Sequence, residues 1–253
     1  MDLPRDLLAE TSLDAAFAGN RLLATLSREE RAMLEPEMEL ISLSGGESVL
    51  SMGKPTERSM FPFDGLMVSM RRELSGGRSV EVAAIGREGA VGGIISCGHA
   101  PAFTQAVVQL PGSAAMITMP VLEKAKQNSA HIRNLFCRYA DALLAQVMQS
   151  VACNAFHPIE ARAARWLLHA HDRAASDRLE LTQESLAGLL GVQRTTVNAV
   201  ARVLQEQGLI AYRRGAIQVI DRPGLLRVSC DCYSVVEEHF HSVLGPDGRG
   251  TTA

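Results

Sequence analysis

The sequence is poor in aromatic residues and has neither a long apolar run nor a basic segment at its start. Aromatic side chains make up 4% of the 253 residues, which disfavours a stacking platform for single-stranded nucleic acid. No stretch approaches the roughly 18 to 20 apolar residues that cross a bilayer, so we expect no membrane partner. Asp2, Asp6 and Glu10 lie where a secretory signal would be basic. We therefore expect a cytoplasmic protein.

Signatures of disulfide-rich proteins and of common enzymes are also missing. The five cysteines are an odd number and do not indicate a disulfide framework. The sequence lacks Gly-x-Ser-x-Gly, the phosphate-binding Gly-x-x-x-x-Gly-Lys and the zinc-binding His-Glu-x-x-His. We therefore predict no catalytic residues and a protein that is not an enzyme.

The apolar residues that are present, 47% of the chain, suffice for two compact domains. Short helices are predicted over residues 20–34, where Ser27 and Glu30 have the spacing of a capping box. From 38 to 118, short apolar runs alternate with glycine and proline. This pattern predicts an antiparallel β barrel or sandwich, with a hairpin turn at 74–77.

Residues 129–155 contain no glycine or proline and predict one long helix. Its apolar positions step by three and four, which leaves a narrow seam of the kind that two parallel helices bury against each other. The seam either forms a dimer interface or packs only on its own barrel, and the pattern favours neither. It consists of Ile132, Leu135, Tyr139, Leu143, Val147 and Val151.

A helix-turn-helix is predicted after residue 181. Thr182 caps a helix over 183–190, and a second helix runs from about Gln193 to Gln207. Ala187, Gly191 and Val197 have the required spacing, because a small residue lets the helices approach, glycine turns the corner and valine fills the angle.

The segment from 192 to 228 is basic, with six arginines against two acidic residues and hence a balance of +4. Two strand patterns flank residues 213–216 and predict a basic hairpin, or wing, directly after the second helix. Arginines that merely solvate a surface are the alternative, but here they coincide with a helix-turn-helix. The six are Arg194, Arg202, Arg213, Arg214, Arg222 and Arg227.

On these residues, the chain resembles the Crp/Fnr superfamily of bacterial transcription regulators over nearly its whole length. The resemblance rests on the glycine-punctuated β region, on the long helix with the following CNAFHPIEARAARWLL, and on LTQESLAGLLGVQRTTVNAVARVLQEQGLIAYRRGAIQVIDRPGLL. It implies an α+β fold with an antiparallel, cyclic-nucleotide-binding-like β-roll (1–128), a dimerisation helix (129–156), a winged helix-turn-helix (157–244) and a disordered tail (245–253). The implied partners are double-stranded DNA, a second copy of the chain and RNA polymerase.

The resemblance also assigns roles on the second helix. The family's base-reading positions fall on Arg194, Thr195 and Ala199, and Arg194 can bond guanine O6 and N7 in a bidentate manner. We expect base reading by Gln193, Arg194, Thr195 and Asn198. Contacts to phosphate, which fix register, are expected from Thr182, Gln183, Thr196, Arg202, Arg213 and Arg214.

The sequence indicates no particular effector and disfavours cyclic AMP. Its phosphate needs a cation, because a buried anion without a partner is costly. The family's arginine is missing from Pro101-Ala102-Phe103-Thr104, and Ala90 replaces the glutamate that would bind the ribose. We predict no cofactor and no metal site, since neither Cys97 with His99 nor Cys230 with Cys232 supplies more than two ligands.

Two alternatives remain at this point. One is a protein-interaction or ligand-binding module whose winged helix does not read DNA. The other is a regulator that senses haem or a metal through Cys97 and His99.

Overall fold

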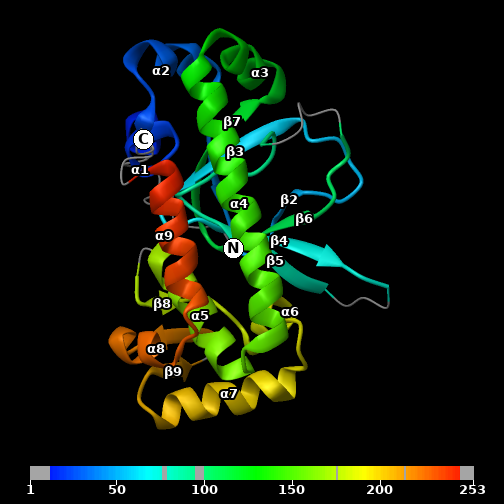
Figure 1. The fold of residues 1–253 in the computed structure, drawn as a ribbon, viewed down its shortest axis with the longest axis vertical. Helices are drawn as coiled ribbons and strands as arrows, with labels where there is room; N and C mark the ends of the chain where they lie inside the picture. Colours follow the sequence, from blue (N-terminus) through cyan, green and yellow to red (C-terminus); the bar gives the residue numbers. More distant parts are fainter. Residues whose placement is uncertain (1–11, 76–78, 95–99, 175, 214, 246–253) are drawn as a thin grey trace, which may run out of the picture.

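The structure, a computed structural model, describes residues 12–75, 79–94, 100–174, 176–213 and 215–245 (Figure 1). It begins with α1 (Leu13–Gly19), the 3-10 turn η2 (Leu23–Thr25), α2 (Arg28–Leu34) and the turn η3 (Glu35–Glu37). The predicted capping box is confirmed at α2. The Glu30 N–H donates to Ser27 Oγ (3.2 Å), and the Ser27 N–H donates to Glu30 Oε2 (2.9 Å).

Two antiparallel sheets form the β-roll. One has the order β1 (Glu39–Leu43), β7 (Gly112–Thr118), β3 (Arg58–Phe63); the other has the order β2 (Ser48–Leu50), β6 (Gln105–Leu110), β4 (Met67–Glu73), β5 (Ser79–Ile85). Met60, Val68 and Val108 belong to one buried cluster that draws on both sheets. The predicted hairpin joins β4 to β5, and residues 76–78 at its turn lie outside the described residues.

Helix α3 (Met119–Asn128) leads into the long helix α4 (Ala130–Phe156), which runs through most of the length of the molecule (Figure 1). Ser129 caps α4 by accepting a hydrogen bond from the Ile132 N–H (3.1 Å). The long helix is therefore confirmed to within a residue at each end. No helix in the described part of the chain combines the length and apolarity of a membrane span.

For the first half of the seam on α4, packing on the chain's own barrel is confirmed, and the assignment of these residues to a dimer interface is wrong. Ile132, Leu135 and Tyr139 are at most 1% exposed and lie in the core that the β-roll and the N-terminal helices form. The Tyr139 hydroxyl donates to the Ala90 carbonyl of the β-roll (3.2 Å). These three residues pack within their own subunit, because the β-roll covers that face of the helix and leaves none of it open to a partner.

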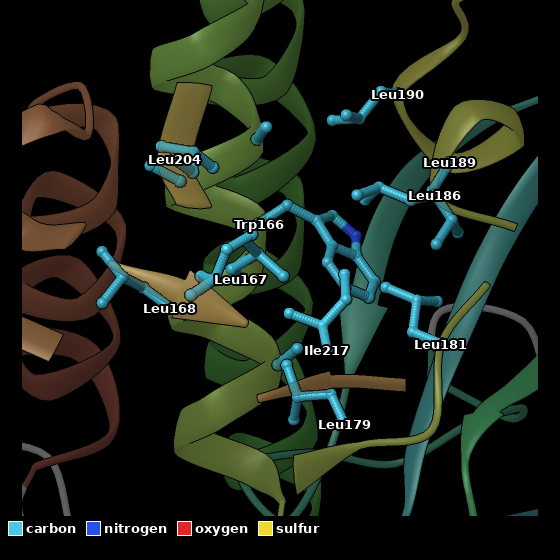
Figure 2. Packing of buried hydrophobic residues seen from close by; sticks show 14 of the residues in the cluster. Trp166, Leu167, Leu168, Leu179, Leu181, Leu186, Leu189, Leu190, Leu204 and Ile217 are labelled. Carbon is cyan, nitrogen blue, oxygen red and sulfur yellow. The ribbon is translucent and has the colours of Figure 1, made fainter. Parts of the chain in front are cut away.

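The C-terminal half is a winged helix. Its elements are α5 (Ile159–Arg173), β8 (Arg178–Leu179), α6 (Gln183–Leu190), α7 (Arg194–Glu206), β9 (Ile210–Arg213), β10 (Ala216–Val219) and α8 (Arg222–Val228). Strands β8, β10 and β9 pair in that order. Trp166 of α5 lies in the core of this half, among leucines such as Leu186 and Leu189 of α6 (Figure 2).

The last helix, α9 (Cys232–Leu244), returns to the N-terminal half and lies beside α4 (Figure 1). Val236, Phe240 and Leu244 are each at most 4% exposed and join the same core as Ile132. His239 and His241 are exposed. The winged helix is thus flanked in sequence by α4, which precedes it, and by α9, which follows it and packs beside α4.

Direct contacts also join the winged helix to the β-roll. Trp166 Nε1 donates to Glu81 Oε1 of β5 (2.8 Å). Burial raises the pKa of Glu81, although this bond and the charges of nearby arginines oppose the shift. The β4–β5 hairpin therefore forms part of the surface on which α5 and α6 rest.

Candidate nucleic-acid interface

The corner between α6 and α7 has the geometry that the sequence predicts. Gly191 ends α6 in the left-handed region, with φ +68° and ψ +32°, where a residue with a Cβ is strained. Its N–H and that of Val192 both donate to the Ala187 carbonyl. Ala187 and Val197 are 4% and 1% exposed. All three positions of the predicted helix-turn-helix are therefore confirmed.

Helix α7 has a buried face and an open face. Val197, Val200 and Leu204 are buried in the winged-helix core. The open face consists of exposed residues at its N-terminal end and middle, Gln193, Arg194, Thr195, Asn198, Ala199 and Arg202. The structure thus brings all four predicted base-reading residues to one end of one exposed helix surface.

The charge at this end is accessible. The Arg194 side chain is 65% exposed, and its Nη1 lies 3.8 Å from Glu184 Oε2, which is itself 75% exposed. An exposed pair of this kind holds its partners weakly, because water competes for both charges. The Arg194 guanidinium is therefore free to exchange Glu184 for another acceptor.

The predicted phosphate-contacting residues occupy different environments. Thr182 caps α6, accepting from the Ser185 N–H (3.0 Å), so its oxygen already has a donor. Gln183 and Thr196 are half-buried, whereas Arg213 at the end of β9 is exposed. Arg202 is 78% exposed and lies 3.4 Å from Glu206. Arg214 lies outside the described residues.

Known proteins share the helix-turn-helix described above. Residues 161–228 match the Crp-like helix-turn-helix domain. A 68-residue segment is 35% identical to the HTH-type transcriptional regulator Cmr of Mycobacterium tuberculosis, and it covers 27% of this chain and 27% of that protein. The matched segment therefore spans about a quarter of the curated relative's length.

The fold extends the likeness beyond this domain. A Crp/Fnr-family structure from Eubacterium rectale covers 82% of this chain and 96% of its own, with a TM-score of 0.64 at 16% identity. FixK2 from Bradyrhizobium japonicum has the same TM-score at 19% identity, covering 76% of this chain and 98% of its own. Residues 161–228 therefore form a Crp-like helix-turn-helix domain, and the chain shares the fold of these Crp/Fnr-family structures.

Not all the arginines of the basic segment, residues 192–228, lie at the interface. Arg222 bonds Asp172 (2.6 Å) and the Tyr233 hydroxyl (2.9 Å), and Arg227 lies 3.4 Å from Asp221. Both belong to α8 and are paired there. The balance of +4 is therefore not one patch, and the described arginines on the open face and wing are Arg194, Arg202 and Arg213.

The glycine-rich loop of the β-roll, residues 86–93, is covered by the protein's own side chains. A Cβ on Gly86 would lie 2.7 Å from Arg173 Cδ, and one on Gly89 would overlap Tyr139. Glu88 Oε1 accepts from the Gly86 N–H (2.9 Å) and from Arg173 Nη2 (2.7 Å). Burial lowers the pKa of Arg173, but the nearby carboxylates of Glu88 and Glu237 raise it overall.

The other predicted effector positions have a mixed outcome. Residues 101–104 contain no cation, but Arg72 of β4 donates to the Phe103 carbonyl (3.0 Å) and lies over its ring at 4.3 Å. No local pattern indicates this contact, because Arg72 and Phe103 are far apart along the chain. Cys97 and His99 lie outside the described residues.

The expectation that only two ligands occur together is wrong for Cys230 and Cys232. The fold brings both next to Cys153 and His157 at the end of α4, with the candidate ligand atoms all within 4.8 Å of one another. In the sequence, the spacing of Cys153 and His157 is the signal that these two side chains can lie together, because residues four apart share a helix face.

Proposed function

We propose that the protein is a homodimeric transcription regulator that reads a partly palindromic operator in double-stranded DNA. The observation that carries this proposal is the open end of α7. Gln193, Arg194, Thr195 and Asn198 are exposed there, on a helix whose other face is fixed in the core and which a wing follows. Two such helices from a dimer enter major grooves about one helical turn, roughly 34 Å, apart.

Within each half-site, Arg194 donates to guanine O6 and N7, and Asn198 has the amide that pairs with adenine. Family members that read a TGTGA-type half-site have glutamate and arginine at the positions of Thr195 and Ala199. The two side chains present here are too short to repeat those contacts, so the operator differs from that type. Backbone phosphates are contacted by the predicted set, with the exposed Arg202 and Arg213 as the strongest members.

A second copy of the chain covers the far half of α4. Leu144, Met148 and Val151 are 50%, 60% and 67% exposed, and they step by four and three along one side of the helix. Of the predicted seam, Val151 belongs to this side, whereas Leu143 and Val147 are half-buried. The dimer interface thus lies on a neighbouring stripe of the same helix, beyond the part that the β-roll covers.

Cyclic AMP is not the effector in this proposal. Residues 101–104 supply no cation, and the 86–93 loop is packed against Tyr139 and Arg173. Arg72 lies over Phe103 and already has the Phe103 carbonyl as an acceptor. RNA polymerase is the further protein partner that a regulator of this family implies, and an enzymatic activity is not part of the proposal.

The test is an unbiased selection of bound duplexes, repeated with two variants. Arg194→Ala should lose the preference for one base pair in each half-site, a discrimination of about 1–3 kcal/mol. Arg227→Ala, which removes an exposed arginine of α8, is the matched control and should select the same site as the wild type. Equal loss on all sequences for Arg194→Ala would refute its role, and no enriched sequence for the wild type would favour a protein-docking winged helix.

A further inference from the structure

Three thiols and an imidazole from distant parts of the chain meet where α4 ends and α9 begins. Cys153 is in the last turn of α4, His157 follows that helix, and Cys230 and Cys232 stand at the start of α9. We propose that these four side chains, the Cys₃His cluster, bind one zinc ion as a structural clasp between α4 and α9. Tetrahedral thiolate and imidazole sets of this composition are typical of zinc.

The distances fit a tetrahedral ion. Cys153 Sγ lies 3.5 Å from Cys230 Sγ, and Cys232 Sγ lies 3.3 Å from His157 Nδ1. Zinc bonds of about 2.3 Å to sulfur and 2.0 Å to nitrogen place two sulfurs about 3.8 Å apart and a sulfur and a nitrogen about 3.5 Å apart. These two pairs therefore need to move by only a few tenths of an ångström, and the other donor pairs lie within 4.8 Å of one another.

The three thiols of the cluster are shielded from solvent, as in structural zinc sites, whereas the His157 side chain is 33% exposed. Cys153 and Cys232 are 0% exposed and Cys230 is 8% exposed. Four protein ligands fill a tetrahedral shell and leave no open position for a substrate. The geometry is therefore that of a structural site rather than a catalytic one.

Neighbouring groups orient the ligands. The other imidazole nitrogen, His157 Nε2, lies 3.7 Å from Asp231 Oδ1, which is the carboxylate–histidine arrangement that often supports a metal-bound imidazole. Gln149 Nε2 donates to Cys232 Sγ (3.0 Å) and so fixes the position of the sulfur.

Two arginines of α5 place positive charge next to the cluster. Zinc with three thiolates carries one net negative charge, and Arg162 and Arg165 interact electrostatically with Cys153. The Nε atoms of both arginines are buried and have no hydrogen-bond partner among the described residues. Positive groups held in this way suit an anionic metal centre and are costly beside neutral thiols.

The position of the cluster gives the ion a role in the architecture. Two ligands precede the winged helix and two follow it, so the ion would close the chain around that whole domain. It would fix the start of α9, whose far end is buried in the β-roll core through Phe240 and Leu244. Loss of the ion would release the clasp that sets how the winged helix is held against α4.

The first experiment measures zinc in the untagged full chain, purified under reducing conditions without chelators. We expect about one zinc per chain, and replacement by cobalt should give the intense visible bands of a tetrahedral site and a sulfur-to-cobalt charge-transfer band. Zinc well below about 0.1 per chain after expression in zinc-supplemented medium would overturn the proposal, as would a Cys153–Cys230 disulfide in the metal-free protein under these conditions. The measurement needs no DNA, so it succeeds or fails independently of the proposed function.

Variants then test the ligands. Cys153→Ser and Cys232→Ser should each lose zinc, whereas Cys137→Ser, which changes an exposed cysteine of the same helix, should keep it. His157→Ala should lose zinc and His157→Cys should retain it, because a fourth thiolate completes the shell. If the serine variants do not fold, a mercurial titration of the double variant Cys97→Ser/Cys137→Ser, which leaves the three thiols of the cluster, should release one zinc per three thiols modified. Zinc that survives in both serine variants, or that is released before those thiols react, would overturn the assignment.

Discussion

The buried ion pair between Glu88 and Arg173 provides the most direct test of how the two halves are joined. Glu88 Oε1 accepts from Arg173 Nε (3.1 Å) and Nη2 (2.7 Å), and the two side chains are 10% and 5% exposed. Removing one member of such a pair leaves the other charge buried and costs about 3–5 kcal/mol. Glu88→Gln keeps an acceptor oxygen and should fall near the lower figure. Arg173→Met leaves a buried carboxylate beside Glu237 and should fall near the upper one.

The double variant separates pairing from general damage. When both changes are combined, no unpaired charge from this pair remains, so the total cost should be at least about 2 kcal/mol less than the sum of the single costs. Urea unfolding followed by the fluorescence of Trp166, the single tryptophan, measures each free energy in the half of the protein that carries Arg173. Arg58→Met, which breaks an exposed pair with Glu39, is the control and should change little. Additive costs, or single variants within about 1 kcal/mol of the wild type, would refute the reasoning.

Three other predictions follow from single side chains. Burial raises the pKa of Glu30, but hydrogen bonds from Ser129 and His131 lower it overall, from 4.5 to about 2. The Glu30 carboxylate therefore stabilises the folded state above pH 4.5, and this stabilisation is lost as the pH falls toward 2. Glu30→Gln should make the free energy of unfolding less dependent on pH in that window, as measured by urea unfolding at several pH values. Met148→Asp should yield monomers in sedimentation with an unchanged circular dichroism spectrum, whereas Met33→Asp on α2 should leave dimers. Arg213→Ala should weaken binding to specific and non-specific duplexes alike and reduce the salt slope by about one.

Local signals in the sequence were enough to predict the helix-turn-helix and the long helix. A cap at Thr182, a left-handed glycine at 191 and a buried valine at 197 act through neighbours only a few residues away, so their spacing is visible in the chain. The length of α4 follows from the absence of glycine and proline in the same way. The exposure of the N-terminal end of α7 can then be predicted, because the apolar residues of the helix show which face is buried.

Features that depend on distant neighbours could not be predicted from the sequence. A step of three and four marks Ile132 and Leu135 as buried, but it does not say whether the β-roll or a second subunit buries them. Cys153 and Cys230 are 77 positions apart, and only the return of α9 brings them together. The pairing of Arg222 with Asp172 likewise removes a charge from the interface through a contact that the local pattern does not contain.

Because α9 returns to the N-terminal half, a cut of the chain between α4 and α5 separates α9 from the core on which it packs. By sequence α9 belongs to the piece that begins at residue 159, but by packing Phe240 and Leu244 belong to the other. A fragment ending at Phe156 would present to water the apolar side chains that α9 now shields, and the complementary fragment would carry an amphipathic helix with nothing to lie on. Neither piece is therefore a self-sufficient folding unit, and mixing the two should restore solubility that each lacks alone.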